Sequence, residues 1–223
     1  MKTLVIAPHA DDELLGCGGT LLRRNFEGVE TGWLLLTRIT KECGWSMPTI
    51  KEKSNQIESV RKGLLIKNEN FFCLDIPATK LELVPTSDLI KQISEVINNF
   101  KPNEIFLPNP SDIHSDHRYT FESALSCTKN FRYPFINRLM TYETLSETEY
   151  GIDPRFNRYN PNVFIDITNF FDKKIKLIKT YKSEIRDAPF PRSIETIEAL
   201  CKIRGSQMGV KYAESFSLLF DYS

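Results

Sequence analysis

The feature that most constrains the fold is a regular alternation of two kinds of segment along the chain. Short apolar runs with strand character alternate with longer runs in which apolar residues recur every three or four positions, as in amphipathic helices. The predicted strands are residues 3–7, 30–37, 70–74, 104–108, 139–143 and 163–166. The predicted helices are residues 13–25, 49–65, 87–99, 116–128, 168–181 and 193–204. The alternation predicts an α/β fold with a Rossmann-like, mostly parallel sheet, core strand order 3-2-1-4-5 and helices on both faces.

One domain accounts for the whole chain. Its 223 residues are enough to bury a sizeable core without disulfides, and no repeat or linker divides them. Residues 38–48 and 150–162 are predicted to be loops at a ligand site. The five cysteines are widely spaced, odd in number and never arranged as Cys-x-x-Cys, which is typical of reduced thiols that take part in packing. We therefore expect a single α/β domain over residues 1–223.

The charge pattern and the N-terminal residues restrict the partners and the location that we expect. The 29 basic and 29 acidic residues give zero net charge, so nothing predicts electrostatic binding to nucleic acid or to anionic lipid. Residues 1–3 lead directly into the first predicted strand, which leaves no room for a signal peptide, and no apolar run reaches membrane-spanning length. We expect a cytoplasmic protein without a membrane span, and a homo-oligomer is compatible with these observations.

The first predicted strand ends in a cluster of ionisable residues. His9 follows the strand, and Asp11, Asp12 and Glu13 come immediately after it. Clustered carboxylates repel one another and raise each other's pKa, so the cluster is unfavourable unless a cation holds it together. Capping of the next helix is the structural alternative for the two aspartates, and for Glu13 a helix-dipole role is as well supported as a functional one. We interpret the cluster as half of a metal site.

A second cluster follows the fourth predicted strand. It contains His114, Asp116 and His117, so all three histidines of the chain lie just after two strand ends. In the order 3-2-1-4-5 the first and fourth strands are neighbours, and ligands bind in the crevice between their carboxyl ends. Asp112 is either a residue that supports the site or a turn residue, and we favour the turn. Helix capping is the structural alternative for Asp116. We therefore expect the two clusters to face each other.

The residue types in the two clusters favour a particular class of ion. Two imidazoles and one carboxylate, with no thiolate, suit Zn²⁺ or another divalent transition metal with one position left open for water. Magnesium and calcium would favour a site made only of oxygen ligands. The carboxylate of the Asp11 and Asp12 pair that is not a ligand could take the proton of that water. This combination predicts a metal-dependent hydrolase.

The two motifs resemble those of the PIG-L/LmbE-like family of zinc-dependent de-N-acetylases. His9-Ala10-Asp11-Asp12-Glu13 is similar to the family's His-Pro-Asp-Asp-Glu, and His114-Ser115-Asp116-His117 is similar to its His-Pro-Asp-His. A weaker similarity covers residues 204–205 and 212–216. The resemblance implies that the metal ligands are His9, Asp12 and His117. It also implies that Asp11 is the general base and that His114 is the acid and oxyanion stabiliser, oriented by Asp116.

The resemblance further implies hydrolysis of the acetyl amide of an amino sugar, such as N-acetylglucosamine, or of a small conjugate of one. Alanine and serine replace the two motif prolines, which offer no ligand, so only loop stiffness should change. In the second predicted helix Lys53 and Gln56 stand where the family often has Arg and Glu. Lys53 is the predicted substrate-binding residue, acting as a point charge rather than a planar fork.

Two other functions are weighed against this one. A catalytically inactive metal- and sugar-binding protein of the same fold is the main alternative, but Asp11 and His114 are unnecessary for holding a metal. A dinucleotide-binding oxidoreductase needs a glycine pattern directly after the first strand, where this chain has carboxylates that would repel a pyrophosphate. The glycine cluster of residues 16–19 falls inside the first predicted helix and predicts close packing against the sheet instead.

Overall fold

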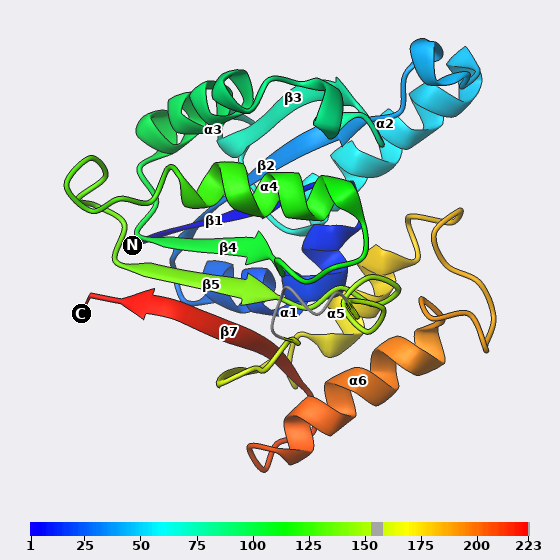
Figure 1. The fold of residues 1–223 in the computed structure, drawn as a ribbon. Coiled ribbons are helices and arrows are strands. Elements are labelled where there is room, and N and C mark those ends of the chain that lie inside the picture. The colour runs from blue at the N-terminus through cyan, green and yellow to red at the C-terminus, as the bar shows by residue number, and fades with distance from the viewer. Residues whose placement is uncertain (153–157, 223) are drawn as a thin grey trace.

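The centre of the protein is a seven-stranded sheet (Figure 1). The computed structural model describes residues 1–152 and 158–222. The strands are β1 Lys2–Ala7, β2 Glu30–Arg38, β3 Phe71–Pro77, β4 Glu104–Pro108, β5 Arg138–Tyr142, β6 Val163–Asp166 and β7 Ala213–Asp221. Their order is β3-β2-β1-β4-β5-β7-β6, with β1 to β5 parallel and β7 antiparallel to both of its neighbours. The predicted core order is therefore confirmed.

Helices cover both faces of the sheet, as predicted. They are α1 Asp12–Phe26, α2 Met47–Gly63, α3 Thr86–Phe100, α4 Ser115–Leu125, α5 Phe171–Ile178 and α6 Ile194–Ser206. The core on one face is formed with α1, α2 and α5, and the core on the other face with α3 and α4 (Figure 1). Strand β1 is buried on both sides, which explains its continuous apolar sequence. Within the described residues, the helices are all too short or too polar to cross a membrane.

Strand β7 is the main difference between the predicted and the observed fold. It inserts between β5 and β6, although the sequence predicts no strand beyond residue 204. The reason is that its first half buries Glu214 and Ser215 among other residues, and buried polar side chains interrupt the apolar alternation that marks a strand. The loop predicted for residues 38–48 holds one short 3₁₀ helix, Lys41–Cys43, and ends where α2 begins. Of the loop predicted for residues 150–162, residues 153–157 lie outside the described part of the chain, and the remainder contains no helix or strand.

The glycine cluster lets α1 pack closely against its neighbours, as the sequence predicts. A Cβ atom on Gly16 would lie 2.3 Å from Cδ2 of Tyr142 on β5, and one on Gly19 would lie 2.8 Å from Ile167. Such distances are far shorter than ordinary carbon contacts. The glycines therefore allow the helix that follows β1 to lie directly over the centre of the sheet.

We expect Gly16→Ala to lower the free energy of unfolding by about 1–3 kcal/mol, because the new methyl group overlaps the buried Tyr142 ring. The loss should occur even though alanine is the better helix former. Urea denaturation of the single variants and of Gly16→Ala/Tyr142→Ala measures the effect. If the added methyl group destabilises the protein as much in the Tyr142→Ala background as in the wild type, the overlap is not the cause.

Candidate metal centre

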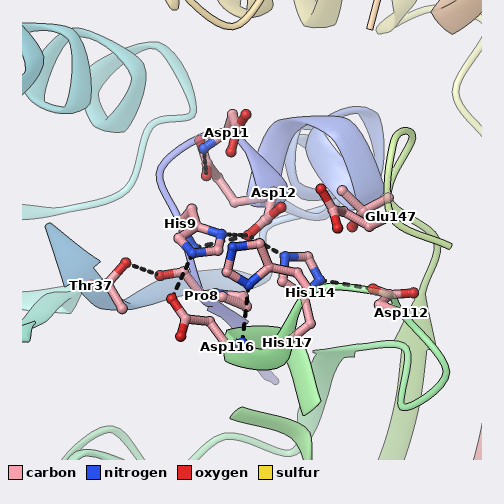
Figure 2. A network of polar contacts seen from close by, with 12 residues as sticks. Pro8, His9, Asp11, Asp12, Thr37, Asp112, His114, Asp116, His117 and Glu147 are labelled. Atoms are coloured by element: carbon pink, nitrogen blue, oxygen red, sulfur yellow. Dashed lines mark hydrogen bonds and ion pairs between the residues drawn. The ribbon is translucent and has the colours of Figure 1, made fainter. Parts of the chain in front are cut away.

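The predicted site residues come together at the carboxyl edge of the sheet. Strands β1 and β4 are parallel neighbours, so the loops that follow them lie side by side. The first loop ends in the ionisable cluster at the start of α1, and the second leads into α4. Figure 2 shows the side chains of both clusters turned toward one another: His9, Asp12, His114, Asp116 and His117. The two clusters therefore face each other, as the sequence predicts.

The carboxylate of Asp12 lies between two imidazoles. Its Oδ2 atom is 3.5 Å from Nδ1 of His9 and 3.4 Å from Nε2 of His117. Ligand atoms bound tetrahedrally to one zinc ion at about 2.0–2.1 Å are about 3.3–3.4 Å apart. Both separations from Asp12 therefore match a tetrahedral site, and the three residues form a group that could hold a metal ion.

The far nitrogen of each imidazole is bound to a second carboxylate. Nε2 of His9 donates to Oδ2 of Asp116 at 2.9 Å, and Nδ1 of His117 donates to Oδ2 of Asp112 at 2.8 Å. Since a carboxylate only accepts, these bonds place a proton on the far nitrogen, and in the neutral ring they leave a lone pair on the nitrogen that faces Asp12. Metal-binding histidines usually have such partners, which orient the ring and increase its basicity. The donor set thus fits a divalent cation.

The two supporting carboxylates are themselves held in place. Asp116 accepts from the backbone N–H groups of Thr79 at 2.8 Å and Leu81 at 3.3 Å. Asp112 accepts from the hydroxyl of Thr148 at 2.7 Å. Of the two roles considered for Asp112, the structure shows both: its backbone N–H closes a turn on the carbonyl of Asn109, and its buried side chain orients His117. No local sequence pattern indicates the contact between Asp112 and His117, because it depends on the conformation of the loop between β4 and α4.

The carboxylates make this place strongly attractive to positive charge. Burial lowers the pKa of His9, but hydrogen bonds to Asp116 and Asp12 outweigh burial and raise that pKa to about 9. Burial also lowers the pKa of His117, and there Asp12 and Asp112 raise it well above its usual value. The two imidazoles in turn hold the pKa of Asp12 well below its usual range, against the effect of burial. A metal cation would substitute for this positive charge on binding.

His114 lies beside the metal ligands but is held differently. Its ring centroid is 4.6 Å from that of His9, and its Nδ1 accepts from the backbone N–H of Asp116 at 3.0 Å. Burial and the neighbouring imidazoles lower its pKa to about 4, so the ring is neutral near pH 7 and carries its proton on Nε2. The contact by which Asp116 orients His114 is made by its backbone amide, while its carboxylate binds His9.

Asp11 stands apart from the metal-binding group. Figure 2 shows it beyond Asp12, on the side away from the imidazoles, and its Oδ2 accepts from Nη1 of Arg192 at 2.9 Å. Burial and the negative charge of Asp12 raise the pKa of Asp11 to about 7, and Arg192 opposes that rise. Within the described residues, Asp11 belongs to neither of the two groups that could hold a metal. Its carboxylate is therefore bound to Arg192 rather than placed among the candidate metal ligands.

Lys53 reaches this region through a chain of ion pairs. Its ammonium group pairs with Glu184, and Glu184 lies 3.6 Å from Nη2 of Arg192, which binds Asp11. Glu184 and Arg192 come from the segment between α5 and α6, where no sequence motif signals a site. Glu13 is buried and accepts from the hydroxyl of Tyr181 and from the backbone N–H of Asp11, each at 3.0 Å, which supports a structural role.

A second group of potential ligands shares His9 with the first. It consists of His9, His114 and Asp116. Asp116 already accepts hydrogen bonds from His9 and from two backbone amides, and Nδ1 of His114 is occupied by an amide. In the first group the nitrogens that face Asp12 carry lone pairs when the rings are neutral, although Oδ2 of Asp12 also accepts from the backbone N–H of His9 at 2.9 Å. The first group is the better cation site.

Comparisons with known proteins agree with this arrangement. A family model described as PIG-L, GlcNAc-PI de-N-acetylase, matches residues 4–128, more than half of the chain and a range that includes both motifs. The chain is 26% identical to the diacetylchitobiose deacetylase of Thermococcus kodakarensis, over 96% of this chain and 81% of the relative.

Solved structures share the whole fold. The conserved protein TT1542 from Thermus thermophilus is 27% identical with a TM-score of 0.77, covering 98% of this chain and 94% of its own. The N,N'-diacetylchitobiose deacetylase from Pyrococcus horikoshii is 23% identical with a TM-score of 0.76, covering 98% of this chain and 83% of its own. These likenesses extend over the C-terminal part that the family model leaves out.

We expect Asp112→Asn to weaken Zn²⁺ binding by about 10–100-fold, because the amide cannot hold Nδ1 of His117 as a charged acceptor does. Competition with a chromophoric chelator measures the affinity. Asp88→Asn, an exposed position on α3, is the matched control and should bind Zn²⁺ like the wild type. Equal affinities for the two variants would show that Asp112 does not support the metal ligand.

Proposed function

The chain belongs to the PIG-L family of GlcNAc-PI de-N-acetylases and is a deacetylase of that family, and from this membership we propose that it hydrolyses the N-acetyl group of a small amino sugar or glycoconjugate in a zinc-dependent reaction. The observation that carries the proposal is the geometry of Asp12 between two imidazoles, each backed by a second carboxylate. Two nitrogen donors and one oxygen donor suit zinc best, and a neighbouring divalent transition metal next best.

His9, Asp12 and His117 would hold the cation. Bound there, it would polarise the acetyl carbonyl group and lower the pKa of a water molecule. All other steps use the protein's own side chains. Asp11, which lies next to a ligand without being one, would accept the proton of the attacking water.

His114 would stabilise the negative charge that develops on the carbonyl oxygen. Its neutral ring can donate a hydrogen bond from Nε2, because Nδ1 is occupied by the amide of Asp116. The carbon–nitrogen bond then breaks, and the proton held by Asp11 passes to the leaving nitrogen. This assigns the return of the proton to Asp11 rather than to His114, whose low pKa makes it a poor proton reservoir. The products are acetate and a free amine.

The nature of the substrate is supported by the relatives and by the charges near Asp11. The Thermococcus relative is a diacetylchitobiose deacetylase, which acts on an acetylated sugar. Arg192 binds the proposed base, and Lys53 pairs with Glu184, which lies 3.6 Å from Arg192. We propose that Lys53 contacts polar groups of the sugar or of its attached group.

One assay tests the proposed function. Acetate release is measured from a panel of N-acetylated sugars, free and conjugated, with a chelator and after addition of Zn²⁺. Release that the chelator abolishes and Zn²⁺ restores is the expected result. Sugar binding without acetate release from any panel member would favour the alternative, an inactive binding protein.

We expect Asp11→Asn to lower kcat by at least about 100-fold while zinc stays bound, because an amide cannot accept the proton. Asp12→Ala and His117→Ala should lose the metal itself. Metal analysis of the purified variants, alongside turnover, separates the two kinds of defect. Undiminished turnover in Asp11→Asn would remove it as the base, and unchanged zinc content in His117→Ala would remove it as a ligand.

We expect Lys53→Met to raise KM by about 3–10-fold with little change in kcat, as for loss of a contact made equally to substrate and transition state. Lys51→Met, an exposed change on the same helix, is the control and should leave both constants unaltered. A lower kcat at constant KM would instead indicate that Lys53 acts on the base through Glu184 and Arg192.

A further inference from the structure

Helix α1, which begins with the ligand Asp12, is broken in its middle. Cys17 has φ −144° and ψ 19°, which is not a helical conformation. In a continuous α-helix the N–H of Gly19 would donate to the carbonyl of Leu15, and the N–H of Thr20 to that of Gly16. Both N–H groups donate instead to the carboxylate of Glu214, at 2.8 and 2.7 Å.

The other side of the break is filled by Lys174. Its ammonium group donates to the carbonyl of Leu15 at 3.0 Å and to Glu214 at 2.7 Å. An ion pair is thus inserted into the hydrogen-bond ladder of the helix, with Glu214 receiving the free N–H groups and Lys174 binding the carbonyl of Leu15. Kinks in helices commonly form where a side chain inserts in this way.

This pair is almost completely removed from solvent. The side chains of Lys174 and Glu214 are 1% and 3% exposed. Burial lowers the pKa of Lys174, but Glu214 outweighs burial and raises it, so the ammonium group stays charged. A buried ion pair contributes little net stability compared with apolar residues of similar size. The position of this ion pair inside α1 therefore indicates that the pair controls the geometry of the helix.

The kink separates the turn that carries the site from the rest of α1. The first turn holds Asp12, and the second half of the helix packs over the sheet. Lys174 lies on α5 and Glu214 on β7, and both elements contact α1 (Figure 1). Both lie outside the range 4–128 that matches the family model. The C-terminal part of the chain is thus in a position to set the direction of the ligand-bearing turn.

We propose that Lys174 and Glu214 are positioning residues of the metal centre, and that their ion pair fixes the kink that aligns Asp12 with the two imidazoles. The inference rests on the proposed function only in that it takes the group of His9, Asp12 and His117 as the metal site. It also gives a role to a sequence feature that the reaction leaves unused, since the segment 212–216 supplies the carboxylate of the pair.

A matched pair of variants tests the proposal. Glu214→Gln removes the charge that binds both N–H groups, and should weaken Zn²⁺ binding at least ~10-fold and lower kcat more than it changes KM. Glu104→Gln is the control. Glu104 is also buried and forms a two-fold ion pair with α1, through Arg24 at 3.0 Å, but at the far end of the helix. The Glu104→Gln variant should have a lower free energy of unfolding and the Zn²⁺ affinity of the wild type.

Zn²⁺ affinity is measured by chelator competition without substrate, and folding by circular dichroism and urea denaturation. If both variants lose stability and both keep wild-type Zn²⁺ affinity and kcat, the pair is merely structural and the proposal is overturned. If Glu214→Gln does not fold, Lys174→Met/Glu214→Gln, which leaves no unpaired buried charge, replaces it. Wild-type Zn²⁺ affinity in that double variant would equally overturn the proposal. Wild-type protein that binds Zn²⁺ but releases no acetate would contradict the proposed function while leaving this inference intact.

Discussion

The structure depends on the repulsion between carboxylates at the carboxyl edge of β1 and β4 and on the positive charge that offsets it. Asp12 stands between two imidazoles at distances suited to a shared cation. Each imidazole is fixed by a second carboxylate, and each of those accepts from a further donor. The negative charge that would be unfavourable in an ordinary core is thus the basis of the site.

The two parts of the chain make different contributions to this site. The first part supplies the proposed metal ligands and the proposed base, on loops that follow adjacent parallel strands. The later part supplies residues that control charge and geometry, namely Arg192 beside the base and the ion pair of Lys174 and Glu214 inside α1. The part of the chain that matches the family model therefore supplies the proposed reacting groups. The C-terminal part controls their charge and position.

Much of the fold could be predicted because its signals are local. Strands β1 and β4 are buried on both sides and read as short apolar runs, and the polar residues after them mark the carboxyl edge. Strand β7 could not be predicted, because it buries Glu214 and Ser215 for contacts made far away in sequence. The support of His117 by Asp112 joins residues only five positions apart, but the sequence left it open, because the contact depends on the fold of the loop before α4.

Local sequence patterns were sufficient to predict the α/β architecture, the strand order of its core and the residue types that meet at the site, because periodicity and the neighbourhood of parallel strands follow from them. Packing in three dimensions was needed to decide which nitrogen of His9 faces Asp12, that Asp116 supports His9 through its carboxylate, and which cationic side chain binds Asp11. Hydrogen bonds between segments a hundred or more residues apart depend on distances of a few tenths of an ångström, and such distances are set by how the whole core packs.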